Sequence, residues 1–441
     1  MSLEEGVLRK LRPKASTIRR LEDAVEHLRG LTEASISRVG MDLHTMLVGS
    51  VAKGTYVGRP DIDLFILFPE TVERRELERV GLRIGQEVLG SETRYAEHPY
   101  SHGTIDGFEV DLVPCYAVQD ASSIRSAVDR TPFHTRFVLS NMDDNKRGQV
   151  LLLKQFMKGV GVYGAEARVQ GFSGYLTELL IIKYGDFRSV LKAAADWRPG
   201  TTMGMEGRHG MDGTTPLTFR DPVDLKRNVS SALSIDKFSM FVHASREYLR
   251  GPDERFFFPP ARPLMDLGAI EATFRIRGNH PFVVVLDRPD LVDDNLYPQV
   301  QRSLLGLRKL LEQYDFQVLD MSYAVDKDVR MVFELASAEL APSKMHQGPP
   351  AWTANADDFV RKWRREGLGQ PFLMDGKWMV YAKREVRDPV TLIMTRGREA
   401  ALGNGLKELK GLKCHVGRSS YRAGNRRVFT LLLDRREAWR A

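Results

Sequence analysis

The sequence predicts a multidomain α+β fold, and three observations lead to this prediction. The chain has 441 residues, which exceeds one ordinary hydrophobic core and corresponds to roughly three domains. Strand and helix patterns are mixed near the start, helical patterns dominate the middle, and strands return after Pro263. With 42% hydrophobic residues, each part can bury a core. We therefore expect domains at residues 1–140, 141–258 and 259–441.

The first domain is predicted to be a small mixed α/β domain. Apolar residues that recur every three or four positions indicate an amphipathic helix, and short apolar or alternating runs indicate strands. The expected elements are a helix at 15–37, a strand at 45–48, a turn at Gly49-Ser50, one or two helical turns at 51–57, strands at 61–68 and 108–113, and a helix at 73–89.

The second domain is predicted to be mostly helical, and the third to contain an antiparallel sheet. Helices are expected around 150–157, 175–184 and 234–248, and the glycine-rich segment 198–215 as a mobile loop or irregular hairpin. In the third domain we expect strands at 282–286, 316–323 and 329–335 and a helix at 304–314. One helix on such a sheet would give a ferredoxin-like or RNA-recognition-like body at 259–350, followed by a tail at 351–441.

The positive charge of the chain is concentrated at one end. Residues 351–441 contain 20 Lys+Arg against 10 Asp+Glu, whereas the rest of the chain holds 45 against 48. The tail is therefore +10 and the remainder −3, and aromatic residues such as Trp363 and Trp378 lie among the tail's basic residues. Such a surface suits a polyanion held by its phosphates, with some stacking. Charge alone leaves an ordinary solvated basic face equally open.

Composition excludes several other classes of protein. No stretch approaches the roughly 20 continuous apolar residues that a membrane span requires, and the first residues lack the pattern of a signal peptide. Cys115 and Cys414 are too few and too far apart for a disulfide framework or a cysteine-rich zinc site. We therefore expect a cytoplasmic protein that does not bind membranes.

Acidic residues on two predicted strands form the candidate catalytic centre. Because side chains alternate along a strand, Asp61 and Asp63 project together while Ile62 points into the core. Asp111 lies on the polar face of another predicted strand, and an adjacent position would bring it beside the pair. Three carboxylates suit two Mg²⁺ ions roughly 3.5 to 4 Å apart, which is the chemistry of nucleotidyl transfer by polymerases.

The residues before the acidic pair favour this functional interpretation. An Asp-x-Asp pair alone is common and usually marks a turn or a solvated strand edge. Here Gly49-Ser50 precedes Asp61 by eleven residues, and it offers backbone N–H groups and a hydroxyl that suit a phosphate. Lys53 adds a positive charge one helical step later. The combination with Asp111 predicts a site for a triphosphate and its metals.

These residues resemble the archaeal-type, class I CCA-adding tRNA nucleotidyltransferases of the polymerase-β-like superfamily. Bacterial and eukaryotic CCA-adding enzymes carry different motifs, so the resemblance is to the archaeal class. It spans essentially the whole chain and is densest at residues 48–69, 94–100, 110–116, 126–134, 153–154, 162–166, 171–176, 221–228 and 292–298.

The resemblance implies a role for each candidate residue. Asp61, Asp63 and Asp111 match the metal-binding carboxylates, and Arg227 matches a residue that reads the incoming base together with the RNA backbone. The positions that match contacts to the incoming nucleotide are Ser50, Lys53, His134, Lys154 and Tyr163. The position of Asp61 is Glu in some relatives, and the position of Lys53 is often Arg. Because lysine lacks the bidentate fork of arginine, Lys53 would contact phosphate as a point charge. For His134, Lys154, Tyr163 and Arg227, the assignment rests mainly on the resemblance.

The resemblance also implies the fold and the reaction. The expected fold is a polymerase-β-like nucleotidyltransferase head at 1–140, a helical central domain that completes the nucleotide pocket at 141–258, and an RNA-binding body and basic tail at 259–441. The expected activity is template-independent addition of CCA to the 3′ end of immature or damaged tRNA, from CTP and ATP, with two Mg²⁺ ions. The acceptor stem and 3′ end of tRNA would be bound, and relatives are commonly homodimers.

Three alternatives remain open from the sequence. A poly(A) or terminal uridylyl polymerase shares the Gly-Ser and Asp-x-Asp chemistry. A small-molecule nucleotidyltransferase would have no obvious use for the body and the +10 tail. An RNA-binding scaffold with an inactive head would be expected to have lost a carboxylate, yet all three are present.

Overall fold

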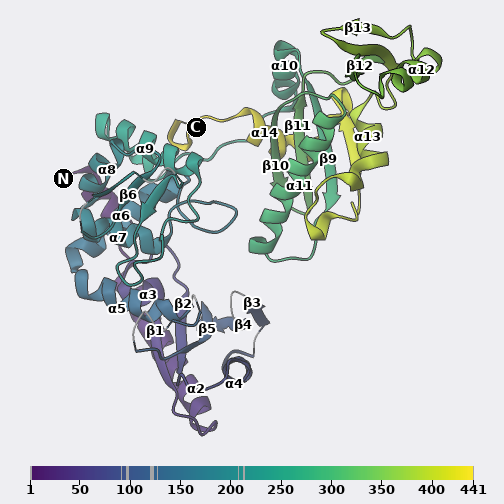
Figure 1. Ribbon diagram of the computed structural model, residues 1–441. Coiled ribbons are helices and arrows are strands. Elements are labelled where there is room, and N and C mark those ends of the chain that lie inside the picture. The colour runs from purple at the N-terminus through teal and green to yellow at the C-terminus, as the bar shows by residue number, and fades with distance from the viewer. Residues whose placement is uncertain are drawn as a thin grey trace. The chain divides into compact units, whose positions relative to one another are not determined.

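The computed structural model describes residues 2–90, 92–95, 99–119, 124–126, 128–206, 208–211 and 214–440, with only the backbone at 92–95 and 208–211. The chain divides into two compact units (Figure 1). One contains the residues up to Ala261 and the end of the chain from Glu437, and the other is Arg262–Arg436. No helix in the described part of the chain combines the length and the apolar character that crossing a membrane requires.

The head of the first unit is a five-stranded sheet in the order β1-β2-β5-β4-β3. β2 runs parallel to β5, and the other neighbouring pairs are antiparallel. Helices α2 and α4 pack on one face, against the buried strand residues Ile62 and Leu64. The bounds are α2 Ala15–Ser37, β1 His44–Val48, α3 Gly49–Lys53, β2 Ile62–Phe68, α4 Arg74–Leu89, β3 Glu92–Tyr95, β4 Pro99–Ile105 and β5 Phe108–Tyr116.

The head elements confirm most of the sequence prediction, with one difference at the Gly-Ser segment. The helix predicted at 15–37 and the strands predicted at 45–48, 61–68 and 108–113 are present with small shifts in their ends. The helix predicted at 51–57 is wrong in its bounds: α3 already begins at Gly49 and stops at Lys53. It stops there because Gly54 adopts the left-handed conformation, with φ +64°, which ends a helix.

The remainder of the first unit is a helical domain with its own large core. Helix α1, at the start of the chain, packs on α6 and contributes Val7 to this core. Three of its helices, α1, α5 and α8, were not predicted from the sequence. The bounds are α1 Leu3–Leu11, α5 Thr131–Asn141, α6 Asp144–Gly159, α7 Gly174–Tyr184, α8 Phe187–Ala195 and α9 Ile235–Arg250.

The glycine-rich segment forms a small sheet in the order β7-β6-β8. Its strands are β6 Thr201–Met203, β7 Arg208–Met211 and β8 Leu217–Phe219. β6 and β7 are antiparallel with an irregular register, which confirms the irregular hairpin expected at 198–215 for the residues that are described. Residues 207, 212 and 213 of that prediction lie outside the described residues. So do residues 96–98 of the resemblance segment at 94–100 and residue 127 of the segment at 126–134.

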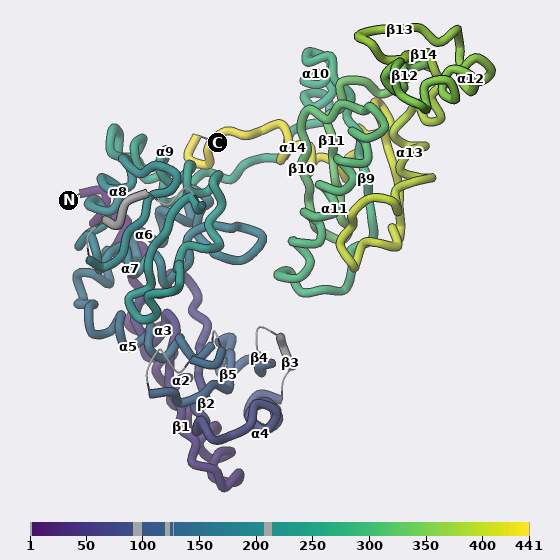
Figure 2. Tube along the Cα trace, in the orientation of Figure 1, coloured from purple at the N-terminus to yellow at the C-terminus, as the bar shows by residue number. Residues whose placement is uncertain are grey.

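The chain returns to the first unit at its end (Figure 2). Trp439 is buried in the core of the helical domain, and its ring stacks on Phe256 with centroids 4.8 Å apart. Glu437 lies 3.2 Å from the imidazole of His243 on α9. The final residues are therefore part of the first unit's core.

The second unit is built on an antiparallel sheet in the order β10-β11-β9-β15. Helices α11 and α13 pack on one face and α10 and α14 on the other. The second pair is a helical layer that the sequence pattern did not predict. The bounds are α10 Leu267–Arg277, β9 His280–Asp287, α11 Asp293–Gln313, β10 Val318–Val325, β11 Asp328–Leu335, α13 Pro389–Arg396, β15 Lys413–Val416 and α14 Arg426–Leu433.

The boundary expected at residue 350 does not separate the body from an independent tail. Strand β15, from the expected tail, pairs with β9 at the sheet edge, and the tail helix α14 packs on the same sheet. β9 is buried along nearly its whole length, so it needs a hydrogen-bonding neighbour on each side. The tail supplies the second of these neighbours.

A smaller sheet, β12-β14-β13, lies within the expected tail and the residues just before it. Helix α12 packs on β12 and β14, with Trp363 against His346 at a centroid distance of 4.8 Å. The opposite side of α12 carries exposed Arg361, Arg364 and Arg365. The bounds are β12 Ser343–Pro350, α12 Ala356–Glu366, β13 Phe372–Met374 and β14 Lys377–Lys383.

Candidate active site

Three strands of the head bring the predicted carboxylates together. Asp63 on β2 stands in register with Asp111 on the parallel strand β5, and with Val48 on β1. Asp61 immediately precedes β2. The three carboxylates line one pocket of about 230 Å³ on the sheet face that α2 and α4 do not cover. The juxtaposition predicted from strand alternation is therefore present.

The pocket concentrates negative charge. Burial, then Asp111 and Asp61, raise the pKa of Asp63 to about 7. Burial and the neighbouring acids Glu109 and Asp111 also raise the pKa of Asp61. Carboxylate oxygens in such a setting match the donors that hard divalent cations prefer. Within the described part of the chain, no three acidic, histidine or cysteine side chains are already grouped closely enough to hold a metal ion.

His102 contacts one of the three acids. It lies opposite Asp111 in the antiparallel β4–β5 pair, and its Nδ1 is 2.7 Å from Asp111 Oδ1. This contact fixes the orientation of the Asp111 carboxylate. This contact was not predicted, because His102 lies on β4, a strand that the sequence analysis did not identify.

Gly49 is required by the position of Asp63. Its φ is +70°, a backbone conformation that residues other than glycine rarely adopt. A Cβ atom there would stand 1.9 Å from Asp63 Oδ2, so even alanine would displace the carboxylate. Ser50 follows directly and lines the same pocket.

Lys53 and Lys154 meet at a buried carboxylate that sequence reasoning missed. Glu178 on α7 accepts hydrogen bonds from Lys53 at 2.6 Å, from Lys154 at 3.0 Å and from the Thr55 hydroxyl at 2.6 Å. Burial alone would raise the pKa of Glu178, but the two ammonium groups hold it well below its usual range. Lys154 lines the carboxylate pocket, whereas Lys53 is not among its lining residues. The cluster therefore links the head to the helical domain.

Tyr163 and Lys158 complete the wall of the pocket on the helical-domain side. Both line it, and the Lys158 ammonium lies 5.4 Å from the centre of the Tyr163 ring. Burial, together with Glu178 and Glu166, raises the pKa of Tyr163 to about 12, so the phenol stays protonated. Lys158 was not predicted, although it follows Lys154 by one helical turn on α6.

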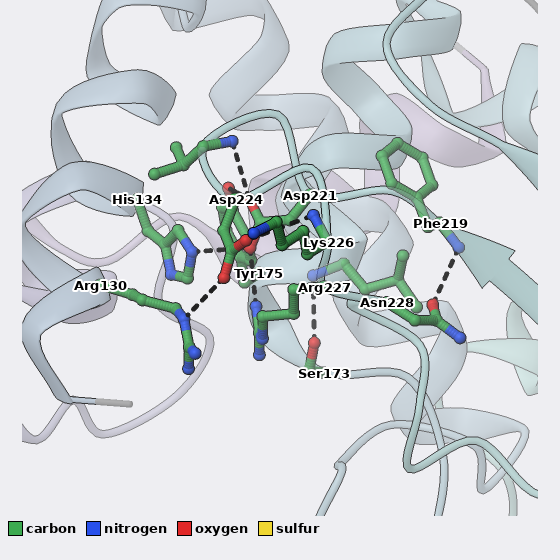
Figure 3. A network of polar contacts seen from close by, with 12 residues as sticks. Arg130, His134, Ser173, Tyr175, Phe219, Asp221, Asp224, Lys226, Arg227 and Asn228 are labelled. Carbon is green, nitrogen blue, oxygen red and sulfur yellow. Dashed lines mark hydrogen bonds and ion pairs between the residues drawn. The ribbon is translucent and has the colours of Figure 1, made fainter. Parts of the chain in front are cut away.

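His134 and Arg227 belong to a second cluster, centred on Asp221 (Figure 3). Asp221 is fully buried, and its Oδ2 lies 2.9 Å from His134 Nε2 and 2.8 Å from Arg227 Nη1. Its Oδ1 accepts from the Tyr175 hydroxyl at 3.1 Å and from the Val223 amide at 3.0 Å. Asp221 had no predicted role.

The partners of Asp221 lower the pKa of its carboxyl group. Burial would raise the pKa of Asp221, but His134, the Val223 amide and Arg227 lower it to about 2. The His134 ring also stacks on Tyr175, with centroids 4.0 Å apart. Neither His134 nor Arg227 lines the carboxylate pocket. The structure thus divides the predicted nucleotide contacts between two neighbouring groups.

Comparison with known proteins identifies the family. A curated CCA-adding enzyme of Methanothermobacter thermautotrophicus is 44% identical over 374 residues, which are 82% of this chain and 81% of that one. This chain belongs to the CCA-adding enzymes. Further CCA-adding enzymes, from Methanosarcina acetivorans and Halobacterium salinarum, are 40% and 39% identical; the matches cover 92% and 90% of this chain and 91% and 89% of theirs.

Family models divide the CCA-adding enzyme into three matched regions. They are a nucleotidyltransferase domain at 28–134, the second domain of tRNA nucleotidyltransferase at 148–258, and the C-terminal domain of CCA-adding enzymes at 277–416. The chain is therefore a tRNA nucleotidyltransferase. Enzymes with this catalytic domain take nucleotide substrates and use divalent metals, in agreement with the acidic pocket.

Solved structures give more distant likenesses. The Cid1 poly(U) polymerase aligns with a TM-score of 0.46 at 13% identity, over 56% of this chain and 92% of that one. A cytoplasmic RNA terminal U-transferase aligns with a TM-score of 0.45 at 14% identity, over 58% of this chain and 98% of that one.

A Gly49→Ala variant of this CCA-adding enzyme should lose most of its nucleotide addition. The added methyl group would push the Asp63 carboxylate from its place, in addition to the backbone strain of about 1–2 kcal/mol at positive φ. Gly58→Ala is the matched control, because Gly58 also has positive φ, +85°, but open space around it. Thermal unfolding should show similar losses of stability in both variants. Single-turnover nucleotide addition should show a large loss of activity only in Gly49→Ala. Equal activities would contradict the steric assignment.

Proposed function

We propose that this CCA-adding enzyme extends immature or damaged tRNA by two C residues from CTP and one A from ATP, without a nucleic-acid template. The 3′-hydroxyl of the tRNA attacks the nucleotide α-phosphate, and pyrophosphate leaves. The observation that carries the proposal is the register of Asp63 with Asp111 in a pocket that also contains Asp61.

The three carboxylates are proposed to hold two Mg²⁺ ions. Bound there, the ions would lower the pKa of the attacking hydroxyl and neutralise the charge of the leaving group. Asp61 lies just before β2, and Asp63 is the second residue of that strand. Both line the same pocket, so we propose that they share the ions. Asp111, which contacts His102, is proposed to lie beside the attacking hydroxyl and to accept its proton.

The remaining predicted residues are proposed to place the nucleotide. Ser50, Lys154 and Tyr163 line the pocket, where a hydroxyl, a positive charge and a phenol suit a triphosphate. Lys53 is proposed to act through Glu178, since it pairs with that residue and is only 7% exposed.

The base of the nucleotide is proposed to lie beside His134 and Arg227. The His134 ring and the Arg227 guanidinium both contact Oδ2 of Asp221. This shared contact fixes the direction of the other N–H groups of the two side chains. An arginine fork so oriented suits recognition of a base edge together with RNA phosphate.

Incubation with tRNA that ends at the discriminator base tests the function. With Mg²⁺ and CTP alone, two C residues should be added, and with both nucleotides the product should end in CCA. ATP alone should give no product on this substrate. A homopolymer of A or U would instead support the alternative, a poly(A) or terminal uridylyl polymerase, and no extension at all would contradict both.

The basic part of the second unit is proposed to bind the tRNA acceptor stem. Arg364 and Arg365 are exposed on α12 and have no ion pair among the described residues. Replacing both by glutamine should weaken tRNA binding and flatten its salt dependence, by about one unit of slope for each lost phosphate contact. Binding titrations at several salt concentrations measure this.

The control for this prediction is the exposed pair Arg19 and Arg20 on α2, replaced in the same way. Deleting residues 351–441 is a poorer test, because it also removes β15 from the body sheet. An unchanged salt slope in the α12 variant would move tRNA binding to another surface.

The proposal also includes a homodimer in the cytoplasm, as the resemblance implies. Light scattering of the purified protein at micromolar concentration measures the mass. A value of 50.0 kDa, that of one chain, would contradict the dimer.

A further inference from the structure

The cations near the carboxylate pocket differ in whether their hydrogen-bond donors are already used. Lys154 is 2% exposed, and its ammonium has three acceptors within the protein. These are the Thr55 carbonyl at 3.0 Å, the Thr55 hydroxyl at 3.2 Å and Glu178 at 3.0 Å. An ammonium group has three donors, so each of those on Lys154 has an acceptor.

Lys53 is also bound to Glu178. Its ammonium donates to Glu178 at 2.6 Å from a side chain that is almost fully buried. Drawing either lysine toward a ligand would leave Glu178 a buried anion with only part of its compensation, which is costly. Both lysines therefore supply positive charge near the pocket while their ammonium groups stay paired with Glu178.

Lys158 lies on the same face of α6, four residues after Lys154, and also lines the pocket. It is exposed, and among the described residues its ammonium makes one hydrogen bond, to the Val57 carbonyl at 3.2 Å. Two of its three donors therefore remain for a ligand. The side chain extends over the Tyr163 ring, which keeps the ammonium beside the pocket.

Arg59 is the other exposed cation of the pocket, and it is placed differently. It comes from the segment just before Asp61, and its guanidinium donates to the carbonyl of Gly107 on the turn before β5. Its guanidinium is thus bonded to the head, next to the strand that carries Asp111. Lys158 comes from the helical domain, on the side of Tyr163 and Lys154.

We propose that Lys158 binds the part of the nucleoside triphosphate that leaves as pyrophosphate. The inference rests on the proposed function and adds a phosphate-binding residue to it. The ammonium donates to phosphate oxygens and offsets their charge as the bond between the α-phosphorus and the bridging oxygen breaks. Because CTP and ATP share this part, Lys158 serves all three additions equally.

Kinetics of a Lys158→Ala variant test the assignment. The KM for CTP and the KM for ATP should rise by the same factor, roughly 10- to 100-fold, the usual effect of losing a charge-assisted hydrogen bond. The KM for pyrophosphate in the reverse reaction should rise as well. Lys158→Arg, which keeps the charge, should recover most of the loss, while tRNA binding and the unfolding temperature stay unchanged.

Lys237→Ala is the matched control. Lys237 on α9 also donates to a backbone carbonyl, that of Gly161 at 2.7 Å, but it does not line the pocket. Its KM values should equal those of the wild type. Unchanged KM values in Lys158→Ala, a rise for only one nucleotide, or a loss that follows a lowered unfolding temperature would each overturn the inference. Failure of the wild-type protein to add CCA would instead overturn the proposed function.

Discussion

An Asp63→Ala variant should lose nucleotide addition by about 10³-fold or more in single-turnover rate. Asp63 stands between Val48 and Asp111 in the sheet, at the centre of the acidic pocket. Removing it would take away a carboxylate proposed to hold both metal ions, and about 4 kcal/mol of lost charge stabilisation corresponds to that factor. Primer extension on a tRNA lacking its 3′ end, at saturating Mg²⁺, measures the rate.

Glu109→Ala is the matched control for this variant. Glu109 lies on β5, two residues before Asp111 and on the same strand face, but it is exposed and does not line the pocket. Its activity should stay near that of the wild type. Asp63→Ala should keep tRNA binding and should not lower the unfolding temperature, because burial and two acids already disfavour the ionised form of Asp63. Wild-type incorporation by Asp63→Ala would refute the metal assignment.

Replacing Glu178 by glutamine should have the largest effect on stability. The variant keeps the shape of the side chain but leaves Lys53 and Lys154 buried without a counter-charge. Removing one partner of a buried ion pair typically costs about 3–5 kcal/mol in the free energy of unfolding. Denaturant unfolding at pH 7 measures the loss, with Glu33→Gln on the exposed side of α2 as the control.

The pH dependence of this loss has a defined sign. The pKa of Glu178 is lower in the folded protein than its ordinary value of 4.5, so its ionised form stabilises the fold above about pH 4.5. The stability difference between wild type and Glu178→Gln should therefore shrink as the pH falls below 4.5. Adding Lys154→Met to Glu178→Gln should restore part of the stability. A difference below about 1 kcal/mol in the free energy of unfolding between the wild type and Glu178→Gln at pH 7 would contradict this prediction. Water would then be solvating the two lysines in place of Glu178.

The strands that carry the three carboxylates are predicted well because the relevant signal is local. Side chains on a strand alternate with a period of two, so Asp61 and Asp63 had to share a face once the strand was recognised. The parallel register of Asp111 with Asp63 is not local, but it was expected from the hypothesis that the three acids share cations. The helix at 15–37 was predicted in full because apolar residues recur at regular three- and four-residue steps from Ile18 to Leu31.

The polar clusters could not be predicted in the same way. Glu178 is a single acid within an apolar helix, which signals burial, but its partners lie 125 and 24 residues away. Asp221 joins side chains from three separate segments, and nothing in its neighbourhood identifies them. Lys158 carried a usable signal, its one-turn spacing from Lys154. The predicted boundary at residue 350 does not divide the second unit, because β15 completes a sheet that begins more than a hundred residues earlier.

The burial of Trp439 has a consequence for synthesis of the protein. Domains usually fold in order as the chain leaves the ribosome. Here the first unit lacks an aromatic side chain of its core until the entire second unit has been translated. During that interval the surface around Phe256 stays exposed to water and to chaperones. A nascent chain stalled before residue 437 should therefore be more sensitive to protease in its helical domain than the finished protein.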